Sequence, residues 1–249
     1  MEGIFAMDGM GTASGTRRER QREQLLLDTR RAAREMAAAE GIDGLTLAAV
    51  ARAVGVSPPA LYRYFEGRDG LVRALYDDLT AELISTVSAA VERQDVDDLS
   101  AQLHAGTLAV FDWSIANRAA FDLLMGSAYP KASRSGGDVP QVIARELGGV
   151  FTKPFEGLWR RGGLAFPADG EIPAALRGQL EAYRAQVCPH LPTGVAYLML
   201  TCWRQIYGIT CMAAYGHLDY AFGDYRALFD DMIASLLALL GLPVSPALR

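Results

Sequence analysis

The sequence predicts an all-α protein in which a small N-terminal three-helix module precedes a larger helical domain. Apolar residues recur at intervals of three and four through most of the chain, and this is the spacing of one helix face. Glycine and proline separate these stretches, and no stretch alternates between apolar and polar residues as a half-buried strand would. With 249 residues, 51% of them hydrophobic, the chain is long enough for one large domain or two modest ones.

The first part of the chain divides into a tail and a helix. Residues 1–16 are rich in Gly, Met, Ser and Thr without periodicity, and we expect them to form a disordered tail. Residues 17–40 follow with one apolar face and several arginines elsewhere, which predicts a helix that ends at Gly41.

Residues 46–71 predict two short helices joined by a tight turn, followed by the start of a third. Thr46 is a good N-cap, and Gly55 stops the first short helix because glycine tolerates a left-handed backbone. We expect Ser57 to cap the second helix, with Pro58 at its first position. Leu61 then faces inward together with Phe65, four residues later. This arrangement is a helix-turn-helix, whose second helix enters the major groove of DNA in proteins that use it for recognition.

The residues around this second helix suit contacts with DNA. Arg63 lies on its outermost face and is the candidate for a bidentate contact with guanine, while hydroxyl groups and helix N-termini suit phosphate. Arg68 is placed to bind phosphate just beyond the helix. The predicted DNA-binding residues are Thr46, Ser57, Pro58, Pro59, Tyr62, Arg63, Tyr64 and Arg68. The arginines of residues 17–22 form either an arm that reaches a neighbouring groove or a solvated helix start.

The distribution of charge agrees with a DNA-binding module on an acidic body. The net charge of the whole chain is −5, but residues 17–73 hold 11 Arg against 8 Asp or Glu. Attraction to phosphate is therefore confined to the N-terminal part of the chain.

Helical patterns continue to the end of the chain. A long helix is expected over residues 69–93, marked by leucines four residues apart. The further expected helices are 99–116, 118–128, 139–161 with a kink or break at Pro154, 173–187, 192–215 and 224–240. We place the domain boundaries at 17–76 and 77–249.

The N-terminal motif resembles the TetR (tetracycline repressor) family of bacterial regulators. The resemblance rests on A-A-x-E-G, then T-L-x-x-V-A-x-x-V-G-V-S-x-x-x-L-Y-R-Y-F, then x-x-R-x-x-L, over about residues 25–83. A second, weaker resemblance lies in residues 202–218, which look like the Trp-x-x-x-x-Gly helix of the regulatory domain in many members. The resemblance implies a DNA-binding domain joined through a fourth helix to a larger ligand-binding and dimerisation domain.

The last two expected helices are apolar on more than one side, which predicts that a second copy of the chain covers them. The resemblance implies the same homodimer, and two-fold symmetry then predicts a palindromic operator. Together with the family's effector cavity, the aromatic residues of the middle predict a pocket for a small, mostly apolar molecule. The predicted ligand-binding residues are Phe111, Trp113, Phe121, Met125, Phe155, Trp159, Trp203, Arg204 and Tyr207. His104 is either a further polar contact or a surface or core residue.

The sequence therefore predicts a cytoplasmic DNA-binding regulator, acting as a repressor that a small apolar ligand releases from its operator. Its three cysteines have no C-x-x-C spacing, and its longest apolar run has Arg204 at its centre, so we expect neither a disulfide scaffold nor a membrane span. We find no catalytic motif and expect no enzyme activity, cofactor or metal. The alternatives are a helical DNA-binding protein without an effector and, further away, an all-α enzyme.

Overall fold

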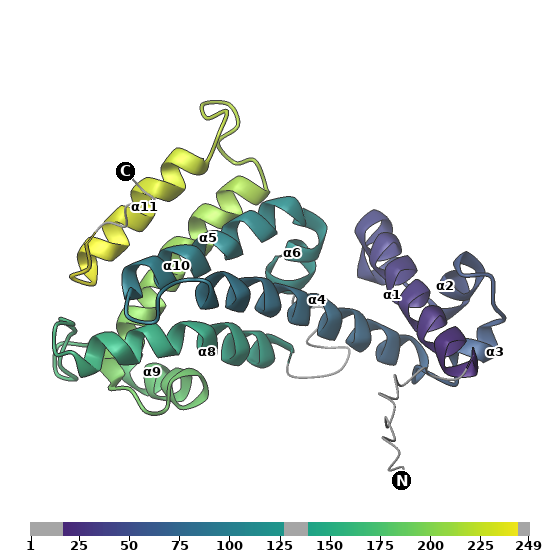
Figure 1. Ribbon diagram of the computed structural model, residues 1–249, viewed down its shortest axis with the longest axis horizontal. Helices are drawn as coiled ribbons and strands as arrows, with labels where there is room; N and C mark the ends of the chain where they lie inside the picture. Colours follow the sequence, from purple (N-terminus) through teal and green to yellow (C-terminus); the bar gives the residue numbers. More distant parts are fainter. Residues whose placement is uncertain (1–16, 127–138, 244–249) are drawn as a thin grey trace, which may run out of the picture.

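The computed structural model describes residues 17–126 and 139–243, and within these ranges it is helical with no strands. Three helices form a small head at one end: α1 (Arg17–Gly44), α2 (Leu47–Ala53) and α3 (Pro58–Leu61). The long helix α4 (Gly67–Glu92) runs from the head into a larger body, which lies at the other end of the molecule (Figure 1). The all-α prediction with a small N-terminal helical module is confirmed.

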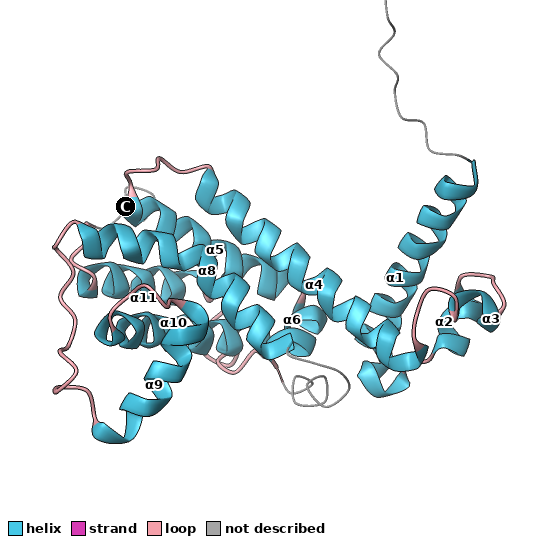
Figure 2. Cartoon of the chain, turned by 90° about the horizontal axis from the view of Figure 1, so that it is seen from below, coloured by secondary structure: helices cyan, strands magenta, loops and turns pink. Residues whose placement is uncertain are grey.

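The body is built around the second half of α4. It contains α5 (Leu99–Ala116), α6 (Arg118–Met125), α8 (Val139–Arg160), α9 (Ala174–Val187), α10 (Thr193–Ala214) and α11 (Arg226–Leu239). α5, α6 and α8 pack directly on α4, while α10 packs on α5, α9 and α11. The helices layer on one another without a sheet (Figure 2), and no described helix is long and apolar enough to cross a membrane.

Two apolar clusters form the core. The first runs along α4 from the head into the body, because the leucines spaced four apart, from Leu71 to Leu83, are all buried on one side of that helix. The second fills the space between α5, α8, α10 and α11, around residues such as Phe111 and Phe229. Phe151 and Trp203 pack against both clusters, so they lie where the two meet.

Most predicted helix limits agree with the structure, and two predictions need correction. Gly41 interrupts α1 with a positive φ of 74°, as expected of a helix-ending glycine, although a short helical continuation reaches Gly44. Of the kink or break predicted at Pro154, the break is absent, because α8 continues through this residue to Arg160. A proline removes one backbone hydrogen bond, and the burial of Pro154 in the body shows that packing offsets this loss. The predicted disordered tail, residues 1–16, lies outside the described residues.

Candidate DNA-reading surface and ligand cavity

The head is held in shape by local contacts that the sequence anticipates. The Thr46 hydroxyl accepts a hydrogen bond from the backbone N–H of Ala49 at 3.2 Å, which is the expected N-cap. Leu61 and Phe65 are buried, with 0% and 7% of their surface exposed. Gly55 has a φ of 74° at the turn between the two short helices, a conformation that favours glycine.

Ser57 does not cap α3 with its side chain, which corrects the prediction. A capping hydroxyl accepts from the second or third N–H of the helix, but the second position is Pro59, which has no N–H, and the third is Ala60. The N–H of Ala60 bonds instead to the backbone oxygen of Ser57 at 2.9 Å. The exposed Ser57 hydroxyl therefore keeps its capacity to contact another molecule.

α3 ends at Leu61, so Tyr62, Arg63 and Tyr64 lie in the turn after it and not on the helix that was expected to carry them. Pro59, Tyr62, Arg63 and Tyr64 are exposed, with 62% of Tyr62 accessible, while Pro58 is half-buried. The first turns of α1 lie beside the exposed face that these residues form, and the guanidinium of Arg22 sits 5.7 Å from the centre of the Tyr64 ring. The segment 17–22 is thus an exposed helix start next to the reading face, in contact with it through Arg22.

Arg68 has a different environment from the one the sequence suggests. It is half-buried, and its guanidinium donates to the backbone oxygens of Leu45 at 3.0 Å and Ile42 at 2.6 Å. These bonds tie the start of α4 to the segment between α1 and α2. Arg68 therefore stabilises the head, and only the N–H groups that these two bonds leave over are available for phosphate.

A polar network joins the head to the body. Arg34 of α1 forms an ion pair with Glu82 of α4 and donates to Asn117 at the end of α5 at 2.8 Å. The indole N–H of Trp113 donates to Glu82 at 2.8 Å. Burial of the Glu82 carboxyl raises its pKa, but the hydrogen bonds from Arg34 and Trp113 and the charge of Arg34 outweigh burial, so the net pKa is lowered. Glu82 is therefore held in its charged form between the two parts of the molecule.

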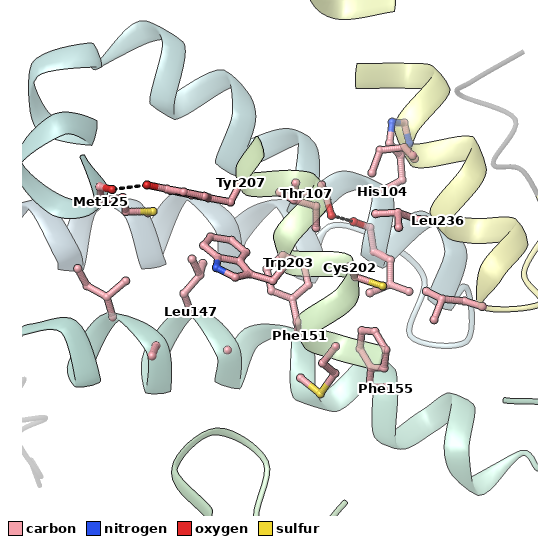
Figure 3. A pocket seen from close by; sticks show the side chains of 18 of the residues that line it. His104, Thr107, Met125, Leu147, Phe151, Phe155, Cys202, Trp203, Tyr207 and Leu236 are labelled. Atoms are coloured by element: carbon pink, nitrogen blue, oxygen red, sulfur yellow. Dashed lines mark hydrogen bonds between the residues drawn. The ribbon is translucent and has the colours of Figure 1, made fainter. Parts of the chain in front are cut away.

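The body contains a partly open cavity of about 460 Å³ where the two apolar clusters meet. This volume falls within the range of roughly 300–1,000 Å³ that small-molecule sites occupy. Leu147 and Phe151 of α8 line the cavity opposite Trp203 and Tyr207 of α10 (Figure 3). Helices α5, α6, α9 and α11 complete the wall, so a ligand in the cavity would touch most of the body.

The lining is apolar, aromatic and without charged side chains among the described residues. Its polar groups are few, and two of them are already bonded: Thr107 donates to the oxygen of Leu103 at 2.7 Å and Tyr207 to the oxygen of Met125 at 2.6 Å. Burial raises the pKa of the Cys202 thiol to about 12, so the thiol stays protonated. Within the same ranges, no group of three or more His, Cys, Asp or Glu is placed to hold a metal ion.

Four of the nine predicted ligand-binding residues lie in the cavity wall: Met125, Phe155, Trp203 and Tyr207. The other five lie elsewhere. Phe111 packs against Phe229 with tilted rings whose centres are 4.5 Å apart, Phe121 is buried beside Tyr207 and Tyr215, and Trp113 is hydrogen-bonded to Glu82. Trp159 and Arg204 are on the surface, where Arg204 bonds to Thr201.

Sequence reasoning missed much of the wall, although a signal was present. The α10 residues that line the cavity are Met199, Cys202, Trp203, Ile206 and Tyr207, which is the three-and-four spacing of one helix face. His104 also lines the cavity and is 5% exposed, and its Nε2 has no hydrogen-bond partner among the described residues. Burial, together with the charge of Arg226, lowers the pKa of His104, so the imidazole is favoured in its neutral form.

The expected dimer helices bury more of their apolar surface inside one chain than the sequence suggests. Ala213 and Ala214 pack within the chain, as do Phe229, Ile233, Leu236 and Leu237 of α11. These α11 residues therefore need no second copy to cover them, and the prediction that a partner does so is wrong for them. Gly208 of α10 has open space around it, and Met212 and Leu239 are 41% and 47% exposed. These three residues mark the part of α10 and α11 that remains available to a partner.

Comparisons with known proteins match both parts of the chain. The family model for bacterial regulatory proteins of the tetR family matches residues 30–75, and a model described as the tetracyclin repressor-like C-terminal domain matches residues 103–236. The HTH-type transcriptional regulator Rv1816 of Mycobacterium tuberculosis is 33% identical over 137 residues, which are 55% of this chain. The match spans 58% of that relative, which is less than two thirds of its length.

Solved structures share the fold over most of the chain. A protein described as a regulatory protein, SCO4313, is 25% identical, with a TM-score of 0.69 over 90% of this chain and 100% of its own. A TetR family transcription regulator from Marinobacter aquaeolei VT8 is 18% identical, with a TM-score of 0.58 over 87% of this chain and 97% of its own. This second likeness concerns the fold alone.

Proposed function

Since the chain belongs to the TetR family of bacterial regulatory proteins, we propose that it is a dimeric repressor released from a palindromic operator by a small, mostly apolar ligand. The observation that carries the DNA-binding part is the outer face of the helix-turn-helix. That face exposes Tyr62, Arg63 and Tyr64 while Leu61 and Phe65 hold it from behind. We place the DNA-binding domain at residues 17–76 and the ligand-binding and dimerisation domain at 77–249, in the cytoplasm.

Arg63 is the residue that reads sequence in this proposal, and the residues around it position the head. A guanidinium matches the two acceptors of guanine in the major groove, and each good bidentate contact discriminates against a wrong base by about 1–3 kcal/mol. Thr46 and Ser57 supply hydroxyls at the starts of the two short helices, where phosphate oxygens bind. A two-fold dimer would place two such heads about 34–36 Å apart on one side of the DNA.

The cavity supports the regulatory part of the proposal and favours it over a DNA-binding protein without an effector. A protein that only bound DNA would gain stability by filling this space, whereas about 460 Å³ stays open between α5, α6, α8 and α10. A ligand there contacts Met125 of α6, and the other end of α6 adjoins Asn117, which holds Arg34 of the head. Ligand binding can thus favour a body conformation in which the two heads no longer match the half-sites.

Selection of bound sequences from random DNA tests the proposal. The full-length protein should enrich a palindrome with two half-sites about one helical turn apart, and footprinting should show protection of both. Arg63→Ala should relax the preference at the same position of each half-site. Retention of DNA without any enriched sequence would contradict a sequence-specific regulator and leave only non-specific attraction to phosphate.

A further inference from the structure

Some polar groups in the cavity wall already have hydrogen-bond partners and others have none. The groups without partners limit which ligands the cavity can bind. Thr107 and Tyr207 already donate to backbone oxygens. By contrast, no hydrogen bond in residues 17–126 and 139–243 involves the indole N–H of Trp203 or the hydroxyl of Tyr183, and His104 Nε2 in the same wall is buried without a partner. An indole N–H only donates, so its partner must be an acceptor.

Trp203 occupies the centre of the site. Its ring lies between Tyr207 and Phe151 and above Leu147 (Figure 3), and it belongs to the contact between the two apolar clusters. The centres of the Trp203 and Tyr207 rings are 6.0 Å apart. A ligand that fills the cavity must therefore lie against the Trp203 side chain.

The described residues of the cavity wall include no side chain that would neutralise a charged ligand. The wall has no Asp, Glu, Lys or Arg among the described residues, and its one described histidine, His104, is favoured in its neutral form by burial and by Arg226. An ionised group buried without a partner pays a large desolvation cost that apolar contacts do not offset. A carboxylate or an ammonium group would therefore bind far more weakly than an uncharged group of the same shape.

We propose that the cavity takes an uncharged, largely apolar molecule with an oxygen acceptor, a carbonyl or hydroxyl, that receives the hydrogen bond of the Trp203 indole N–H. This inference rests on the proposed role of the cavity as the effector site. It adds the charge of the ligand, the polar atom that faces Trp203 and the residue that selects for that atom.

Three probes with one ring system test the proposal in the full-length protein without DNA: 2-ethylnaphthalene, 2-acetylnaphthalene and 2-naphthoate. The ketone and the carboxylate have nearly the same shape and differ in charge, and the hydrocarbon lacks the oxygen. By calorimetry or tryptophan fluorescence at pH 7, the ketone should bind roughly 2- to 12-fold more tightly than the hydrocarbon, as one net hydrogen bond allows. The carboxylate should bind at least about 100-fold more weakly than the ketone, because its charge is buried unpaired.

Trp203→Phe keeps an aromatic ring and removes the N–H. It should erase the preference for the ketone over the hydrocarbon, while Trp159→Phe, on the surface and outside the cavity wall, should leave that preference unchanged. A carboxylate that binds as tightly as the ketone overturns the proposal, and so does failure of all three probes to bind. A Trp203→Phe variant that weakens ketone and hydrocarbon equally, or a loss of the preference only in Tyr183→Phe, overturns the assignment to Trp203.

The experiments distinguish a failure of the proposed function from a failure of this inference. If the ketone binds with the expected preference but does not release operator DNA, the chemistry of the cavity stands and its regulatory role does not. If operator DNA is released by a carboxylate instead, the regulatory role stands and the cavity does not select an uncharged ligand.

Discussion

The head and the body use aromatic side chains in opposite ways. In the head, Tyr62 and Tyr64 are exposed beside Arg63 in the turn that follows α3, and the buried Leu61 fixes this turn from behind. In the body, Phe151 and Trp203 point inward and surround space that they do not fill. Recognition of a large, charged partner requires rigid exposed groups, whereas recognition of a small apolar one requires unfilled volume. The two parts therefore respond differently to substitution, and variants can separate them.

The largest expected effect is on the core of the head. Leu61 is fully buried, so Leu61→Ala should destabilise the head by about 2–5 kcal/mol and abolish binding to operator DNA. Binding of 2-acetylnaphthalene to the cavity should persist, because Leu61 is not part of its wall. Hydrogen exchange measures the stability of the head, and ligand titration measures binding to the cavity. Loss of ligand binding along with DNA binding would show that the apolar cluster along α4 makes head and body one cooperative unit.

Arg63→Ala tests the reading surface without disturbing the core. Because Arg63 is exposed, the fold should be unaffected, and each half-site should lose about 1–3 kcal/mol of discrimination at one base position. Competition between operator and scrambled DNA measures this loss. Arg160→Ala, an exposed arginine on the body, is the matched control and should not change the preference. Equal weakening on both DNAs would make Arg63 a phosphate contact only.

A substitution that fills the cavity should have the opposite outcome to Leu61→Ala: ligand binding is lost and DNA binding is kept. Cys202 is 6% exposed and lines the cavity, so Cys202→Leu should place extra apolar atoms in the open space. Thermal unfolding should show stability unchanged or raised by about 0.5–2 kcal/mol, with ligand binding lost and operator affinity retained. A strongly destabilised variant would indicate that the space cannot accept the added atoms without strain.

The smallest expected effect is at the junction between the two parts. Because the pKa of Glu82 is lowered below its ordinary value of 4.5, its ion pair stabilises the fold above that pH and loses this effect as pH falls through the folded-state pKa. Glu82→Gln should reduce stability at pH 7 by less than about 1 kcal/mol, since the pair is partly exposed. Denaturant unfolding across pH should show the difference shrinking at acid pH. A difference that is constant with pH would contradict the charged pair.

Sequence reasoning worked better for the head than for the cavity, and the reason is physical. The cap at Thr46 and the burial of Leu61 and Phe65 depend on neighbours a few residues away, so spacing alone predicted them. The environment of Arg68 depends on the backbone oxygens of Ile42 and Leu45, more than 20 residues earlier, and it was not foreseen. Composition could not separate Trp203, in the wall, from Trp113, which bonds to Glu82.

The same limit of sequence-based prediction applies to the dimer contact, because burial there depends on distant parts of the chain. Leu236 is apolar and close to the end of the chain, which suggests a partner contact, but in the structure it is buried and lines the cavity. Leu239, three residues later, is 47% exposed on the same helix. We therefore expect Leu239→Glu to weaken the dimer and Leu236→Glu to disrupt the body, and light scattering combined with thermal unfolding distinguishes the two. Loss of the dimer in Leu236→Glu with an intact fold would contradict this placement.

Reciprocity between the two sites tests whether the cavity controls the reading head. Calorimetry would measure 2-acetylnaphthalene binding to the full-length protein, alone and saturated with the selected operator. Thermodynamic linkage requires operator DNA to weaken ligand binding by the same factor by which the ligand weakens DNA binding, and we expect a factor of roughly 5 to 150. Equal ligand affinities with and without operator would show that the cavity binds its ligand without any influence on the head.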